Sequence, residues 1–333
     1  MSLSSSSTAQ AAPALTQAEA VQLYRTLLLA RRTEELIGRE YDRDEMKTPV
    51  HLGIGEEAIP IGVWHAVPAG STAFGTYRNH ALYLAVTGET DALFGELYGK
   101  ATGPGKGKAG SMHVASPEHG LIATSAVVAT TIPLAVGAAL AHAYRGAPNL
   151  VAVFFGDGAV EEGAFWESLN FACLRGLRIL FVCEDNHLAI HTPSSQRQGF
   201  RSLPDAVQGF RCSVGSCDGS DLPGVIAAAR QLMDRMEQTG QPGLLHATYL
   251  RRLEHVGPRE DFQAGYRAQP SPEQLRQLDP VARFERVLAD LGCPPEALEE
   301  MAAGVDAQLA RSLQLAREAP FPAADELHTD AWA

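Results

Sequence analysis

Residues 150–186 read LVAVFFGDGAVEEGAFWESLNFACLRGLRILFVCEDN, two apolar runs separated by a helical stretch. Both runs, at residues 150–155 and 179–183, are apolar at consecutive positions, which indicates parallel strands buried on both faces. The first run leads into a Gly-Asp-Gly turn around Asp157, and the second is followed by Asn186. If the two strands are neighbours, both side chains lie at the same edge of the sheet and share one crevice.

The residues of this crevice suit a divalent cation that carries a diphosphate. Mg²⁺ commonly takes few ligands from the protein and the rest from phosphates and water, so one carboxylate and one amide oxygen would suffice. Gly156 and Gly158 are predicted to let the backbone approach the phosphates. The helix that follows directs its N-terminus at the same place, which favours an anion. Alone, Gly-Asp-Gly is more often only a turn.

The rest of the chain repeats the strand–helix pattern, which predicts an α/β fold. We expect a doubly wound, mostly parallel sheet with helices on both faces and a C-terminal helical extension. The predicted domains are a disordered tail at residues 1–15, an α/β domain at 16–260 and the helical extension at 261–333. The other predicted elements are a helix from Thr16 with a capping box, short helical stretches and turns over 72–113, helices over 133–144, 161–174 and 221–237, and strands over 212–214 and 244–250.

Composition excludes several classes of protein. The 333 residues are 45% hydrophobic and 20% charged, a globular profile, and the net charge of −12 argues against a nucleic-acid surface. The five cysteines contain no C-x-x-C pair, which predicts reduced thiols and a cytoplasmic location. We expect no membrane span and no signal peptide.

Four further motifs occur in order around this centre: HLGIGEEA, TYRNH, KGKAGSMH and VATTIPLAVGAA. Together with the fingerprint at residues 154–186, they resemble the alpha subunit of the thiamine diphosphate-dependent 2-oxo acid dehydrogenases, of the pyruvate, branched-chain or acetoin type. The resemblance covers residues 20–320, and five ordered motifs make it specific. It implies a thiamine diphosphate-binding fold of the diphosphate-binding type.

The resemblance implies a role for individual residues. Asp157, Asn186 and the carbonyl of Leu188 would ligate Mg²⁺. The expected cofactor contacts are Tyr77, Arg78, Ala126, Val128, Gly156, Asp157, Gly158, Asn186 and Arg251. Val128 would support the bent cofactor, and Tyr77, Arg78 and Arg251 would hold the diphosphate. His255 and His80 would be catalytic.

The sequence departs from the family pattern at four places. Asp185 replaces the first residue of an Asn-Asn pair, and Leu188 replaces a tyrosine. One extra residue separates Tyr249 from Arg251. The family's His-Ser-x-Ser-Asp loop reads His-Val-Gly-Pro from His255, which argues against phosphorylation there and leaves the acyl acceptor open.

The implied function is decarboxylation of a 2-oxo acid and transfer of the acyl unit to an acceptor. The implied assembly has two alpha and two beta chains, and the beta subunit supplies the activating glutamate, so this chain alone would be inactive. The acceptor could be a lipoyl group on an acyltransferase, an aldehyde or a carrier-protein thiol. The alternatives are transketolase-like transfer and a non-catalytic chain that only binds a partner.

Other motifs are interpreted without a function. The segment from Gly105 to Gly110 matches G-x-G-x-x-G but follows no strand, so a NAD site is disfavoured. Gly107-Lys108 is followed by Ala109 and not by Ser or Thr, which separately rules out a P-loop. The resemblance places Lys106, Lys108 and His113 on the approach to the site. His51, His80, His113 and His255 lack zinc-site spacing. The pairs Glu56-Glu57 and Glu161-Glu162 are expected on solvated faces.

Overall fold

The computed structural model describes residues 15–329 as one sheet enclosed by helices. The sheet has six strands in the order β2-β1-β3-β4-β8-β7, and every neighbouring pair is parallel. Its strands are β1 Thr72–Thr76, β2 Leu121–Ser125, β3 Val151–Gly156, β4 Ile179–Asp185, β7 Ser213–Asp218 and β8 Gly243–Thr248. The predicted α/β fold with a parallel sheet is confirmed.

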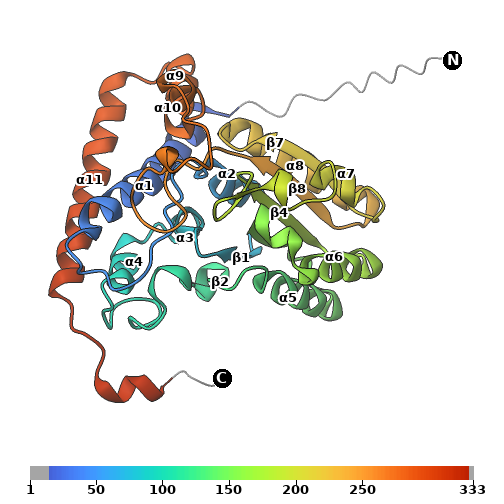
Figure 1. Ribbon diagram of the computed structural model, residues 1–333, viewed down its shortest axis with the longest axis horizontal. Helices are drawn as coiled ribbons and strands as arrows, with labels where there is room; N and C mark the ends of the chain where they lie inside the picture. Colours follow the sequence, from blue (N-terminus) through green and yellow to red (C-terminus); the bar gives the residue numbers. More distant parts are fainter. Residues whose placement is uncertain (1–14, 330–333) are drawn as a thin grey trace.

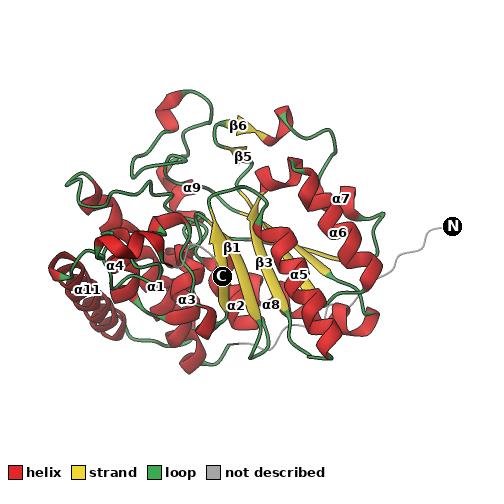
Figure 2. Cartoon of the chain, turned by 90° about the horizontal axis from the view of Figure 1, so that it is seen from below, coloured by secondary structure: helices red, strands yellow, loops and turns green. Residues whose placement is uncertain are grey.

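Helices cover both faces of this sheet, as Figures 1 and 2 show. The helices of the main body are α1 Gln17–Tyr41, α2 Ala58–Ala66, α3 His80–Thr87, α4 Thr90–Leu97, α5 Thr131–Arg145, α6 Gly163–Arg175, α7 Leu203–Val207 and α8 Leu222–Thr239. α5, α6 and α7 belong to the apolar core on one face, whereas α1, α2, α3 and α8 belong to the core on the other.

Consecutive residues of the central strands enter opposite cores, which explains their apolar runs. Phe154 and Val182 belong to the core with α2 and α8, and their neighbours Phe155 and Cys183 belong to the core with α5 and α6. A strand that alternates between two apolar cores needs an apolar residue at every position. The prediction of strands buried on both faces is therefore confirmed.

The sequence predictions were wrong or incomplete for β1, β2 and β7. Residues 72–76 were assigned to helical stretches but form β1, and β2 was not predicted. Their sequences, TAFGT and LIATS, are short and mix apolar with small polar residues, so neither carries a continuous apolar run. β7 is an edge strand with no fully buried residue, and only its first two residues had been predicted.

The C-terminal helices pack against the N-terminal part of the chain. They are α9 Pro272–Gln277, α10 Pro280–Asp290 and α11 Pro295–Glu318. α10 contacts α1, and α11 contacts both α1 and α4, along one side of the molecule in Figure 1. The helical character of residues 270–329 is as predicted, while the domain division at residue 260 stays a prediction.

The start of α1 follows the predicted capping box. Thr16 accepts a hydrogen bond from the backbone N–H of Glu19, and the Glu19 carboxylate accepts one from the N–H of Thr16. The predicted tail lies outside the described residues except for Leu15, which packs against the core. All five cysteines are free, and no helix over residues 15–329 is long and apolar enough to cross a membrane.

A buried ion pair fixes the HLGIGEEA segment between α1 and the C-terminal helices. The Arg31 Nε lies 2.6 Å from Glu57 Oε1, and its Nη1 lies 3.1 Å from Asp279, the N-cap of α10. Glu57 also accepts a hydrogen bond of 2.8 Å from the N–H of Gly55. Burial opposes the charge of Arg31, but Glu57 and Asp279 raise the pKa of its guanidinium above the usual value.

Replacing Arg31 with alanine should therefore cost about 3–5 kcal/mol of unfolding free energy, because Glu57 is left as an unpaired buried charge. Urea unfolding of the purified chain measures this loss. The matched control is Arg32→Ala, since Arg32 lies partly exposed on the same helix and pairs with the more exposed carboxylates of Glu35 at 3.5 Å and Asp306 at 3.9 Å; it should cost less than about 0.5 kcal/mol. Equal losses for the two variants would contradict the assignment.

Candidate active site

Asp157 and Asn186 lie at the same edge of the sheet because β3 and β4 pair in register. The ladder runs from Val151–Ile179 to Gly156–Glu184, so the residues that follow both strands leave the sheet together. Both line a cavity of about 370 Å³, within the size range of small-molecule sites. Figure 2 shows the short hairpin of β5 Leu188–Ala189 and β6 Thr192–Pro193 beyond this end of the sheet.

The Asp157 carboxylate is buried and only partly neutralised. Its Oδ2 forms an ion pair with Arg197, and its Oδ1 is buried without a hydrogen-bond partner. Burial and the neighbouring Asp185 charge raise its pKa, and Arg197 opposes them. An unpaired buried carboxylate oxygen in a residue that lines a cavity is a suitable ligand for a hard cation. Arg197, which also bonds Glu161, carries no motif, so sequence reasoning missed it.

Asn186 and the residues after it form a tight turn. The Asn186 Oδ1 accepts a hydrogen bond of 3.1 Å from the N–H of Leu188, and both residues line the cavity. Between them, His187 has a positive φ of 63°. That conformation is uncommon for a residue with a side chain and marks a constrained turn. The predicted metal residues Asp157, Asn186 and Leu188 are thus brought together around one cavity.

The substituted Asp185 does not line this cavity. Its Oδ2 lies 2.7 Å from His246 Nε2, and its Oδ1 accepts a bond of 2.7 Å from the His187 N–H. Burial raises the pKa of Asp185, but the interactions with His246 and His187 lower it by more, so the pKa lies below the usual value. The departure from the family pattern is therefore paired with a histidine on β8 and leaves the cavity lining unchanged.

The two glycines of the Gly-Asp-Gly turn differ in their surroundings. Gly156 has ordinary extended dihedrals, and a Cβ there would meet only the Glu184 carbonyl, at 3.9 Å. A Cβ on Gly158 would lie 3.0 Å from the Cβ of Ala189. The close approach required of a glycine is therefore at Gly158, against the β5 segment. From Asp157 the chain continues as a 3-10 turn, Asp157–Glu161, before α6 begins.

Tyr77, Arg78, His51 and His255 form an aromatic and cationic wall of the cavity. The ring centroids of Tyr77 and His255 lie 4.4 Å and 5.1 Å from that of His51. Arg78 is buried, donates to the Leu52 carbonyl at 2.9 Å, and lies 3.3 Å from His255 Nδ1. Burial and the Arg78 charge lower the pKa of both histidines to about 3. Both imidazoles are therefore neutral near pH 7.

Ala126 and Val128 lie in the segment between β2 and α5, opposite that wall. Both line the cavity, and Val128 is half exposed. Ala129 after them has a φ of 65°, and Thr130 donates to the Val127 carbonyl, which closes the turn into α5. The segment therefore presents apolar side chains and backbone groups to the cavity, as the cofactor interpretation requires.

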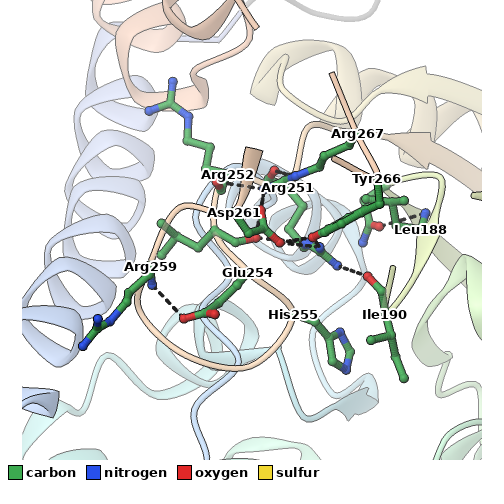
Figure 3. Close-up of polar contacts among 12 residues, drawn as sticks. Leu188, Ile190, Arg251, Arg252, Glu254, His255, Arg259, Asp261, Tyr266 and Arg267 are labelled. Atoms are coloured by element: carbon green, nitrogen blue, oxygen red, sulfur yellow. Dashed lines mark hydrogen bonds and ion pairs between the residues drawn. The ribbon is translucent and has the colours of Figure 1, made fainter. Parts of the chain in front are cut away.

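Arg251 is turned away from the cavity and does not appear among its described lining residues. Its guanidinium donates to the carbonyl of Ile190 at 3.0 Å and to the hydroxyl of Tyr266 at 2.8 Å, and it pairs with Asp261 (Figure 3). Burial and the charge of Arg78 lower its pKa to about 10. Its contact with the cavity is therefore indirect, through the lining residue Ile190, and a direct bond to a diphosphate stays a prediction.

His80 is fully buried beside the cavity. Its Nδ1 lies 3.2 Å from Glu34, and its Nε2 lies 2.9 Å from the Ser111 hydroxyl. Burial lowers its pKa, but the charge of Glu34 and the bonds to Glu34 and Ser111 raise it above the usual value. The catalytic role stays a prediction, because His80 is not among the lining residues within the part of the chain that is described.

Glu56 and Glu57 are buried, so the expectation of a solvated face is wrong for this pair. They point in different directions: Glu57 pairs with Arg31, whereas Glu56 lines the cavity beside Glu184. Burial and the Glu184 charge raise the pKa of Glu56, and burial raises that of Glu184 to about 7. Sequence reasoning missed the burial of Glu56 and Glu57, because two adjacent charged residues in a motif give no sign of burial. Glu161 and Glu162 are exposed, as expected.

The glycine-rich segment from Gly105 to Gly110 is organised around an internal carboxylate. The two oxygens of Glu96 accept hydrogen bonds from the N–H groups of Gly105, Gly107, Ala109 and Gly110, at 2.7 to 3.1 Å. These donors are therefore not available to a phosphate, and the weak NAD interpretation loses its remaining basis. Lys106 and Lys108 contact Glu326 and, like His113, do not line the cavity.

No cluster of three or more histidine, cysteine or acidic side chains suited to a metal occurs between residues 15 and 329. A histidine-based zinc site is thereby not supported. The predicted cation site combines one carboxylate, one amide and one backbone carbonyl, which is a set of hard oxygens without histidine.

Comparison with known proteins identifies the family. The alpha subunit of acetoin:2,6-dichlorophenolindophenol oxidoreductase from Cupriavidus necator is 32% identical over 312 residues, 93% of each chain. The pyruvate dehydrogenase E1 component subunit alpha of Zymomonas mobilis is 31% identical over 314 residues, 94% of this chain and 88% of that protein. The alpha subunit of acetoin:2,6-dichlorophenolindophenol oxidoreductase from Bacillus subtilis is 29% identical over 318 residues, 96% of this chain and 95% of that protein.

Residues 25–325 match the family described as the dehydrogenase E1 component, which spans the sheet, the cavity and the C-terminal helices. The resemblance drawn from five motifs is confirmed over nearly the whole chain. This chain belongs to the dehydrogenase E1 component family and is similar to the alpha subunits of its thiamine diphosphate-dependent members.

Proposed function

We propose that this chain binds the diphosphate of thiamine diphosphate through Mg²⁺ and, with a beta subunit, decarboxylates a 2-oxo acid. The observation that carries the proposal is the unpartnered, buried Oδ1 of Asp157, a residue that lines one cavity with Asn186 and Arg78. A carboxylate oxygen without a partner costs free energy unless a cation or donor meets it. Membership of the E1 family supplies the cofactor class.

Asp157, Asn186 and the carbonyl of Leu188 would hold the cation. These three groups come from two adjacent strand ends, and hard oxygens are the ligands that Mg²⁺ prefers. The cation would also oppose the repulsion between Asp157 and Asp185, which raises the pKa of Asp157.

Arg78 and Tyr77 would contact the diphosphate directly, since both line the cavity and a guanidinium matches phosphate geometry. Arg251 would support the same region by holding Ile190 in place. The neighbouring cations that lower the pKa of Arg251 would be offset by the charge of a bound diphosphate. Ala126 and Val128 would contact the organic part of the cofactor.

Thiamine diphosphate, when bound, supplies the carbon nucleophile that adds to the substrate carbonyl. The residues of this chain orient the reactants and control protons. His255 is neutral, lies at the cavity wall and is held by Arg78, so it can donate a hydrogen bond from its ring N–H to a developing oxyanion. His80 would act through Ser111, next to the lining residue Met112, without itself touching the substrate.

A beta subunit would complete the site and supply the activating glutamate. Exposed apolar side chains surround the cavity and fit such an interface: Val127, Val128, Ile190 and Val256. We propose two alpha and two beta chains. The five free cysteines support a reducing compartment, and we propose a cytoplasmic location.

The acyl acceptor is proposed to be a lipoyl group on a partner acyltransferase. An aldehyde or a carrier-protein thiol would give an acyloin or an acyl thioester at the same cavity. The relatives named for acetoin and for pyruvate support a small 2-oxo acid or acyloin as substrate. A transketolase-like reaction or a non-catalytic role is distinguished by assaying carbon dioxide release from 2-oxo acids.

Substitution of Asp157 by alanine should abolish Mg²⁺-dependent binding of thiamine diphosphate, with a loss of at least about 100-fold in affinity because a charged ligand is removed. Titration calorimetry on the alpha–beta complex measures it. Asp234→Ala is the control, since Asp234 is exposed on α8. Unchanged affinity in the Asp157 variant would refute the cation site.

The His255→Ala variant should bind the cofactor within about threefold of the wild type but turn over about 100-fold more slowly, a typical loss for a group that handles protons or charge. Steady-state carbon dioxide release gives the rate. His119→Ala, at an exposed position, should retain full activity. Full activity in the His255 variant would exclude the residue from catalysis.

The neutral state of His51 predicts a pH dependence of stability. Its pKa of about 3 in the folded chain lies below the unfolded value of 6.5, so below pH 6.5 the unfolded chain binds a proton that the folded chain does not. Stability is thus present above pH 6.5 and lost progressively towards pH 3. The fall in unfolding free energy from pH 7 to pH 5 should be about 1–2 kcal/mol smaller in His51→Gln. Urea unfolding at both pH values measures it; equal falls would show that His51 titrates normally.

A further inference from the structure

The orientation of the Asn186 side-chain amide decides whether this residue can bind a cation. One side of the amide offers an oxygen, and the other offers an NH₂ group whose hydrogens repel a positive charge. The two orientations have nearly the same shape, so the hydrogen-bond partners must select one. In this chain the partner of the NH₂ group is Tyr249, the residue whose spacing from Arg251 departs from the family pattern.

Tyr249 lies next to Asn186 because the ends of β4 and β8 meet. The N–H of Tyr249 donates to the carbonyl of Asp185 at 2.9 Å, which continues the pairing of the two strands beyond Thr248. The Tyr249 ring is buried. Its hydroxyl oxygen lies 3.0 Å from Asn186 Nδ2. The backbone pairing therefore fixes where this hydroxyl lies.

The N–H of Leu188 determines the direction of these hydrogen bonds. A backbone N–H can only donate, so the oxygen of the Asn186 amide must face it, and Oδ1 accepts from Leu188 at 3.1 Å. The Asn186 Nδ2 thus faces Tyr249 and donates to its hydroxyl oxygen.

We propose that Tyr249 is a positioning residue that directs the Asn186 amide oxygen at the bound Mg²⁺. This inference rests on the proposed function. Without the Tyr249 hydroxyl, the amide loses the acceptor for its NH₂ group and can rotate to present that group to the cation. Tyr249 does not touch the cation in this scheme, so it acts on the affinity for the cation and not on the chemical step.

The test uses Tyr249→Phe in the full chain assembled with its beta subunit. Thiamine diphosphate binding is followed by calorimetry at increasing Mg²⁺ concentrations. The half-saturating Mg²⁺ concentration should rise about 10–100-fold, the usual effect of removing a partner that orients a metal ligand. At saturating Mg²⁺ and cofactor, turnover should stay within about twofold of the wild type. A half-saturating concentration within twofold of the wild type would overturn the proposal.

Tyr24→Phe is the matched control, because Tyr24 is also a buried tyrosine whose hydroxyl bonds another side chain, Glu285 at 2.8 Å, away from the cavity. It should leave the Mg²⁺ dependence unchanged.

A second background separates orientation from a general structural effect. In Asn186→Asp, a carboxylate presents an oxygen to the cation in either orientation. Adding Tyr249→Phe to this variant should change the half-saturating Mg²⁺ concentration less than about twofold, whereas the same loss as in the Asn186 background would overturn the proposal. If the wild-type complex itself shows no Mg²⁺-dependent binding, the proposed function fails first.

Discussion

The in-register parallel pairing of β3 with β4 is the constraint on which the site depends. It brings the residues after both strands to one point, although Asp157 and Asn186 are separated by a complete helix. A slip of one residue would exchange every side chain of the strand between the two cores, so the apolar packing on both faces holds the register. The geometry of the candidate cation site is therefore fixed by the hydrophobic core.

Near this edge of the sheet, buried arginines form ion pairs and hydrogen bonds that fix the conformation of loop segments. Arg31 with Glu57 fixes the segment before α2, Arg197 joins the 3-10 turn after β3 to the chain after β6, and Arg251 holds the carbonyl of Ile190. Buried ion pairs contribute little net stability, but removing one partner is costly. Their effect here is to restrict the conformations of segments that form the cavity wall and that the sheet alone does not position.

Features of the fold and the site could be predicted from the sequence where they depend on residues close together in the chain. β3 and β4 were predicted because a strand buried on both faces must be apolar throughout. β1 and β2 were not, because short strands of small and polar residues carry no such pattern. Asp157, Asn186 and Arg78, which the motifs singled out, line one cavity, while their roles stay predictions. The motifs could not show that Arg251 turns towards Tyr266 or that Glu56 is buried, since both depend on distant segments.

The loop after His255 shows how a departure from the family pattern can preserve a position. Gly257 has a φ of 119°, and a Cβ there would lie 2.3 Å from Glu254 Oε1, so the turn requires glycine. The N–H of Gly257 donates to the carbonyl of Val50 at 2.8 Å, which ties the loop to the segment that carries His51. With the Arg78 guanidinium bonded to the carbonyl of His255 at 3.1 Å, the backbone that carries the imidazole is held at His255 and at Gly257. A serine-containing loop is thus unnecessary for placing this histidine, and the altered residues bear on what approaches the cavity from outside.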